Sequence, residues 1–302
     1  MIYRMRAMFL ASFVMLCLGM MSALATGQVL VPDSISQGSL VIGTAPEGAS
    51  IKFEGEDLAI APGGQFVFGF GRDAAPDSAL QVSYADGTTE IIELQIAARQ
   101  YNVQRISGLP PKKVNPPAEL QERLRKERGK VAVARAQFSD VMDWSKPFIW
   151  PAQGKVTGVY GSQRVLNDIP KRPHFGLDVA GPVGTPIYAP AGGEVMLAEA
   201  DFYYEGGIII IDHGYGVMST MFHMNSVDVA AGTIVTQGQQ VGTIGAAGRA
   251  TGPHVDWRIN WNGRRLDPRF LVGDMPADDQ SDQKTYNNDH VAKYCALVGC
   301  IS

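Results

Sequence analysis

The sequence predicts a mainly β protein in three parts: a small N-terminal β-sandwich, a linker with one charged helix, and a C-terminal antiparallel β domain. The 302 residues include 34 glycines and 18 prolines, which suit short strands and tight turns better than helices. Apolar residues alternate in short runs separated by turn signals, as in half-buried strands. With 45% hydrophobic and 19% charged residues, the chain can form a packed core, which excludes a disordered protein.

The N-terminal residues 1–25 have the pattern of a secretory signal peptide. Arg4 and Arg6 precede an uncharged apolar run that ends in the small residues of a cleavage site. We expect cleavage after Ala25 and export to the periplasm or cell envelope. The uncharged run of 19 residues is also just long enough to span a bilayer, so a membrane anchor is the alternative.

The formal net charge is −4, which gives no electrostatic reason to expect nucleic acid or an anionic membrane as a partner. Residues 26–108 predict the β-sandwich and contain no histidine or cysteine, so we expect a spacer or docking domain without chemistry. Its predicted strands are Val41–Ile42, Ile51–Phe53, Gln65–Phe68, Leu80–Tyr84 and Ile91–Ile96.

Residues 109–147 change in character. Two Pro-Pro pairs indicate a linker, and the charged run 118–136 predicts a helix. The segment Lys112–Lys130 contains seven basic residues and three glutamates. They form either a patch for an acidic polymer or a solvated helix face, and the solvated face is the commoner explanation.

Residues 148–273 return to short strands and turns, and four of the five histidines lie here. The predicted strands are Gly193–Leu197, Ile208–Asp212, Val217–Phe222, Val241–Ile244 and Val255–Ile259. The polar tail, residues 274–302, holds Cys295 and Cys300, for which an exported protein favours a disulfide over free thiols. His290 in this tail has no expected role.

Three motifs carry groups suited to a metal site. His174 lies four residues before Asp178, His223 follows an aromatic residue, and His254 and Asp256 lie two apart in a strand-like run. Alternate residues of a strand share a face, so His254 and Asp256 can share a ligand. Each motif alone is weak, because a histidine near an aspartate is often a hydrogen-bonded surface pair.

Together these motifs resemble the lysostaphin/LytM-type zinc peptidoglycan endopeptidases over about residues 148–271. Similar flanking segments are GPVGTPIYAPA at 181–191, IIIDHG at 209–214 and GQQVGTI at 238–244. The resemblance implies a small antiparallel β domain of the LytM/duplicated-hybrid-motif type with a groove above its central sheet. It also implies a metallopeptidase that uses one zinc ion to hydrolyse amide bonds of peptidoglycan peptides.

By position, the resemblance implies that His174, Asp178 and Asp256 bind zinc and that His223 and His254 are catalytic, as base and oxyanion stabiliser in an order left open. The family has a histidine where this chain has Asp256. A carboxylate binds zinc at about the same distance as an imidazole. It leaves a formal charge of about 0 rather than about +1 at the metal, which weakens polarisation of a carbonyl and acidification of water. It also shifts the preference toward harder ions such as manganese.

Further basic and histidine side chains have weaker assignments. His213 matches a family position beside a turn, where we expect a structural role. Arg164, Lys171 and Arg172 precede His174 and would rim the groove. There they would contact carboxylates of wall peptides, although ordinary solvent-facing charge explains them equally well.

Two functions compete. A zinc endopeptidase is favoured, because four of the five site positions keep the chemistry of the family. The alternative is a non-catalytic LytM-like domain that binds and regulates a peptidoglycan hydrolase. A pure wall-binding module would not explain His223.

Overall fold

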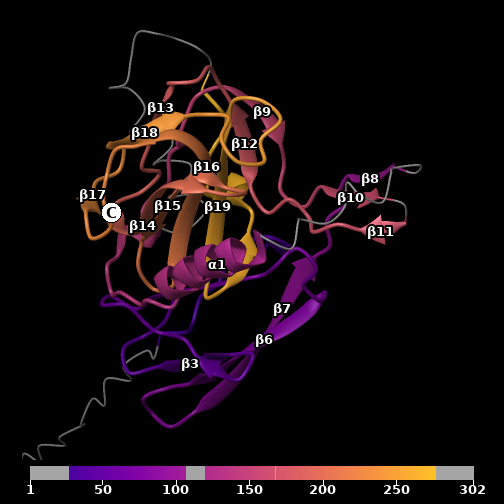
Figure 1. Ribbon diagram of the computed structural model, residues 1–302. Coiled ribbons are helices and arrows are strands. Elements are labelled where there is room, and N and C mark those ends of the chain that lie inside the picture. The colour runs from indigo at the N-terminus through magenta and orange to yellow at the C-terminus, as the bar shows by residue number, and fades with distance from the viewer. Residues whose placement is uncertain (1–26, 107–119, 167, 277–302) are drawn as a thin grey trace, which may run out of the picture.

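The computed structural model describes residues 27–106, 120–166 and 168–276 and confirms a mainly β protein with antiparallel sheets (Figure 1). The predicted signal peptide, the two Pro-Pro pairs, and Cys295, Cys300 and His290 lie outside the described residues. In the part of the chain that the structure describes, no helix is both long and apolar enough to cross a membrane. Each run of residues predicted as a strand overlaps a strand.

The N-terminal part contains two sheets. Strands β2 (Leu40–Thr44) and β5 (Gln65–Gly69) form one; the other has the order β1 (Ile35–Ser36), β7 (Thr89–Ala97), β6 (Asp77–Ser83), β3 (Ser50–Phe53), β4 (Glu56–Asp57). Phe53, Phe66, Phe68 and Phe70 are buried and pack against one another with ring centroids 5.0–6.0 Å apart. Burial of such rings is a main source of core stability. This core continues into the C-terminal part, because one cluster of buried apolar side chains extends from Val29 to Val272.

A further small sheet connects the two parts. Strand β8 (Val103–Ile106) pairs in parallel with β10 (Gln163–Leu166), and β10 pairs with β11 (Ile169–Pro170). The loop that follows is closed by backbone hydrogen bonds: His174 donates to Ser162, and Gly161 donates to His174, both at 2.8 Å. These bonds fix the backbone of His174.

The C-terminal part is built on a ten-stranded antiparallel sheet. Its main path is β17 (Ile234–Val235), β14 (Gly193–Phe202), β15 (Gly206–Asp212), β16 (Val217–Val227), β19 (His254–Trp261), β12 (Leu177–Ala180), β9 (Lys155–Gly158). Strand β13 (Pro186–Tyr188) pairs with β18 (Gln240–Ile244), which also pairs with β16, and β20 (Arg264–Leu266) pairs with β19.

The two faces of β19 differ in polarity. Val255, Trp257 and Ile259 are fully buried in the core, and the alternating residues His254, Asp256, Arg258 and Asn260 therefore share the opposite, polar face. Helix α1 (Gln121–Arg135) lies across the large sheet (Figure 1). Its buried Ala134 belongs to one cluster with side chains of β14, β15 and β16, among them Phe222, which lies opposite Asp256 in the strand register. Helix α1 and the polar residues of β19 thus lie on the same face of the large sheet.

His213 is buried within the C-terminal part. Its Nδ1–H donates to the Gly192 carbonyl at 2.6 Å, and its Nε2 lies 2.8 Å from the Ser219 hydroxyl. Both ring nitrogens of the neutral imidazole are therefore satisfied. Burial lowers the pKa of His213 from 6.5 to about 4. The contacts agree with the expected structural role.

The pKa of His213 predicts acid destabilisation. Between pH 6.5 and about 4 the unfolded chain binds a proton at His213 that the folded chain does not. The contribution of His213 to the free energy of unfolding should therefore fall by up to about 3 kcal/mol across this window and stay constant above it. Denaturant titrations at pH 7, 5.5 and 4 measure the effect. His213→Gln keeps polar contacts without titrating, so it should lose less stability; an equal loss in both proteins would contradict the assignment.

Candidate metal centre

Two aspartates face each other on the polar face of the sheet. The register of β12 and β19 sets Asp178 directly opposite Asp256, and His174 approaches from the preceding loop. One donor atom from each of these three side chains lies within 4.8 Å of the others. Like charges directly opposite on neighbouring strands repel. This arrangement therefore calls for positive charge between or beside the carboxylates.

His174 and Asp178 provide two unpartnered polar atoms. Nε2 of His174 lies 3.2 Å from Oδ1 of Asp178. Both atoms are buried, and neither has a well-aligned hydrogen-bond partner within the described residues. Burial by itself lowers the pKa of His174, but the Asp178 and Asp256 carboxylates outweigh it and the net pKa is raised. Buried polar atoms normally have partners, so a metal ion fits as the common partner of this pair.

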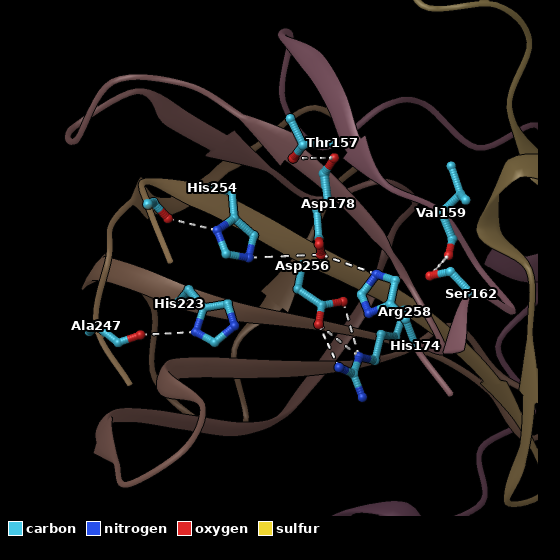
Figure 2. A network of polar contacts seen from close by, with 11 residues as sticks. Thr157, Val159, Ser162, His174, Asp178, His223, Ala247, His254, Asp256 and Arg258 are labelled. Atoms are coloured by element: carbon cyan, nitrogen blue, oxygen red, sulfur yellow. Dashed lines mark hydrogen bonds and ion pairs between the residues drawn. The ribbon is translucent and has the colours of Figure 1, made fainter. Parts of the chain in front are cut away.

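Asp256 has a different environment, because Arg258 holds it. Nε of Arg258 donates to Oδ1 at 3.0 Å and Nη2 donates to Oδ2 at 2.5 Å (Figure 2). The guanidinium group also lies over the Phe222 ring, 4.6 Å from its centroid. Burial opposes the charged form of Asp256, but Arg258 outweighs it and lowers the pKa of the carboxyl. A carboxylate offers about four lone-pair sites, so Asp256 can accept from Arg258 and still bind an ion.

His223 and His254 lie on the other side of the aspartates (Figure 2). Their rings are 4.8 Å apart. The Nδ1–H of His223 donates to the Ala247 carbonyl at 2.9 Å, and that of His254 donates to the Gly252 carbonyl at 2.8 Å. These bonds leave Nε2 of each ring for the site, and Nε2 of His254 lies 3.8 Å from Oδ1 of Asp178.

The backbone at His223 is unusual. Its φ of 63° lies in the left-handed region, which is uncommon for residues other than glycine. The residue interrupts the pairing of β15 with β16, and its N–H donates to the Glu205 carbonyl at 2.7 Å. Strained conformations of this kind persist when the surrounding structure determines them and cluster at functional sites.

Two glycines make room for the carboxylates. A Cβ at Gly158 would overlap the Asp178 carboxylate, and a Cβ at Gly176 would overlap that of Asp256. Gly158 lies opposite Asp178 in the pairing of β9 with β12. The sequence gives no signal for Gly158, because its function depends on that pairing. Arg258 did carry a signal, since it follows Asp256 by two residues in a predicted strand.

The structure thus brings together all five side chains that the sequence singled out. Residues 172–268 match peptidase family M23, and this match contains all five. Over this segment the chain is similar to peptidase family M23. The resemblance found in the sequence is therefore confirmed, whereas the roles of the individual side chains stay predictions.

Similar proteins include enzymes of bacterial cell walls. The chain is 37% identical over 103 residues to peptidoglycan DD-endopeptidase ShyA of Vibrio cholerae, covering 33% of this chain and 24% of ShyA. It is 32% identical over 115 residues to DD-carboxypeptidase/endopeptidase Mpg of Neisseria meningitidis, covering 38% of this chain and 26% of Mpg. The chain thus spans about a quarter of the length of these curated relatives.

A solved structure extends the likeness beyond the family match. A crystal structure described as a peptidase M23 from Pseudomonas aeruginosa has a TM-score of 0.61 at 26% identity, and covers 79% of this chain and 95% of that chain. The similarity in fold therefore includes part of the chain outside residues 172–268.

Proposed function

We propose that the protein is a zinc-dependent endopeptidase that hydrolyses amide bonds of peptidoglycan peptides in the cell envelope. The observation that carries the proposal is the buried, unpartnered pair of His174 Nε2 and Asp178 Oδ1, with Asp256 in reach as a third donor. Nitrogen and carboxylate oxygen donors suit zinc. The similarity to ShyA, a peptidoglycan DD-endopeptidase, supports the substrate class, and the predicted signal peptide supports the location.

Arg258 offsets the extra negative charge that Asp256 brings to the metal centre. One histidine and two aspartates reduce the formal charge of a zinc centre to about 0, but the guanidinium group in contact with Asp256 returns it to about +1. The Asp256–Arg258 pair is a neutral unit, as a histidine ligand is. Hydrogen bonds to a ligating carboxylate also fix its orientation. The donor set therefore fits a single zinc ion.

The two other histidines would move protons beside the ion. Zinc, when bound, supplies polarisation of the scissile carbonyl and a nucleophilic water. His223 and His254 both have Nδ1 fixed on a backbone carbonyl, which leaves Nε2 to accept the proton of the attacking water or to donate to the developing oxyanion. Their contacts are alike, so the assignment of base and oxyanion stabiliser stays open.

One observation favours a non-catalytic domain. Arg258 already neutralises the charge of Asp256, one of the two facing carboxylates. The two carboxylates can therefore lie close together with less positive charge from a metal ion. A non-catalytic M23 domain that binds and regulates a peptidoglycan hydrolase would keep the groove without hydrolysis. Zinc content and hydrolysis measured together distinguish the two functions.

The test uses the purified full chain. We expect one zinc per chain by elemental analysis and release of cleaved muropeptides from purified sacculi. Removal of the metal with a chelator should abolish release, and added zinc should restore it. Bound zinc without any release would support the regulatory alternative, and a chain that binds no zinc would reject the metal centre.

A further inference from the structure

Four arginines gather on the polar face of the large sheet, beside the candidate metal centre. Arg258 lies on β19 and Arg265 on β20, Arg135 is the last residue of α1, and Arg172 lies in the loop before His174. The positive charges of Arg135, Arg172 and Arg258 all act on Arg265, and those of Arg258 and Arg172 act on Arg135. We call these four residues the arginine cluster.

Neutral side chains hold two members of the cluster in place. Nη2 of Arg135 donates to the Thr220 hydroxyl at 3.2 Å, and Nη1 of Arg265 donates to the Asn260 amide oxygen at 2.7 Å. Thr220 lies opposite Arg258 in the pairing of β16 with β19, and the Asn260 amide is 3.5 Å from the Thr220 hydroxyl. One hydrogen-bonded chain therefore runs from α1 across β16 and β19 to β20.

The cluster has more positive charge than its surroundings offset. Among the residues that the structure describes, only Arg258 of the four has an acidic partner within 4.0 Å, and Nε of Arg135 is buried without any hydrogen-bond partner. Burial and then the neighbouring guanidinium groups lower the pKa of Arg135 to about 10 and that of Arg265 to about 9. Both side chains remain charged at neutral pH.

Few acids face the cluster. Asp256 is committed to Arg258. The charge of Glu205 acts on Arg135, Arg172 and Arg258, but Glu205 is in contact with none of them in the described structure, and burial raises its pKa. Like charges held together without partners cost stability, and neutral side chains would satisfy Thr220 and Asn260 without that cost. An anionic ligand would offset the excess charge.

We propose that Arg135, Arg172 and Arg265, with Arg258 at their border, bind a carboxylate of the peptide whose amide bond is cleaved at the metal centre. Guanidinium groups match the geometry of a carboxylate with paired hydrogen bonds. The location supports a substrate group, because Arg258 contacts Asp256 and Arg172 lies two residues before His174. The identity of the ligand as substrate rests on the proposed function; the anion site itself does not.

The cluster also borders a larger space. A cavity of about 390 Å³ is lined by residues 70–75, 77 and 78 and Glu54 of the N-terminal part and by Phe175, Arg264 and Arg265 of the C-terminal part. Arg264 is paired with Glu54, and Arg72 with Asp73, which leaves Arg265 as the cavity-lining arginine without an acidic partner in the described structure. A peptide bound through its carboxylate can extend into this space.

Binding of two matched peptides tests the site without reference to hydrolysis. We would titrate the full chain, treated with a chelator, with diacetyl-L-lysyl-D-alanyl-D-alanine and with its C-terminal carboxamide. The free carboxylate should bind at least about tenfold more tightly, the preference expected from hydrogen bonds to a charged group. Arg135→Gln, Arg265→Gln and the exposed Arg172→Gln should each reduce this preference, whereas Arg125→Gln, on the outer face of α1, should not.

Thermal unfolding separates recognition from a structural role. Arg135→Gln removes one of four mutually repelling charges, so the Tm should stay constant or rise, and the peptide should no longer raise it. Equal binding of acid and carboxamide, or tighter binding of inorganic phosphate than of the acid, would overturn the proposal. A clear preference for the acid in a protein that hydrolyses nothing would support the site and reject the endopeptidase. Hydrolysis without a preference for the acid would support the endopeptidase and reject the carboxylate site.

Discussion

Replacement of His174 or Asp178 by alanine should abolish stoichiometric zinc binding and peptidoglycan hydrolysis while leaving the β fold intact. These two side chains supply the unpartnered donor atoms of the candidate centre. Loss of a residue that only orients a ligand costs about 10- to 100-fold in metal affinity, so loss of a ligand itself should cost more than about 10²-fold. Hydrolysis should fall with the metal.

The fold should tolerate both changes, because Nε2 of His174 and Oδ1 of Asp178 have no hydrogen-bond partner in the part of the chain that the structure describes. Loss of Asp178 also removes a charge that faces Asp256. Circular dichroism and thermal unfolding check this, with zinc content and muropeptide release measured on the same samples. Asp57→Ala is a matched control, since that exposed aspartate lies on the N-terminal sheet and pairs with Lys52 there. Unchanged zinc content in both His174→Ala and Asp178→Ala would refute the ligand assignment.

The second large effect is on stability and comes from Asp256→His. An imidazole cannot accept the two parallel hydrogen bonds of Arg258, so the change leaves a largely buried guanidinium group, with a side chain 20% exposed, unpaired. Removal of one partner of a buried ion pair typically costs about 3–5 kcal/mol. The double variant Asp256→His/Arg258→Gln should recover most of that loss, and urea denaturation of the four proteins measures the coupling.

The same variants test whether Asp256 is a working metal ligand. If Asp256 is a working ligand, Asp256→His should displace the ion and lose activity, since a shift of about 1 Å can cost ~10²-fold in rate. If the site has decayed, the introduced histidine supplies the missing ligand. A gain in both zinc affinity and muropeptide release in the variant would therefore defeat the enzymatic proposal.

Local sequence patterns predicted the longest strands and the helix. The run Val255–Ile259 became part of β19 because alternation of apolar and polar residues matches the two faces of a strand. The charged run before the C-terminal part became α1, Gln121–Arg135, because it lacks strand periodicity and strong breakers. The position of α1 was not predicted. Its hydrogen bond from Arg135 to Thr220 joins residues 85 apart, and a helical pattern does not specify which sheet face the helix covers.

The sequence by itself determined which residue types form the site, because their chemistry suits a metal ion. It also determined that His254 and Asp256 share one face, because alternate residues of a strand point to the same side. Only the tertiary structure decided that Asp178 lies opposite Asp256, that Gly158 makes room for a carboxylate, and that four arginines are near enough for their charges to act on one another. These features depend on strand register and on packing of segments far apart in the chain. The free energy that selects this register and packing is summed over contacts of the whole core. No single sequence motif therefore predicts them.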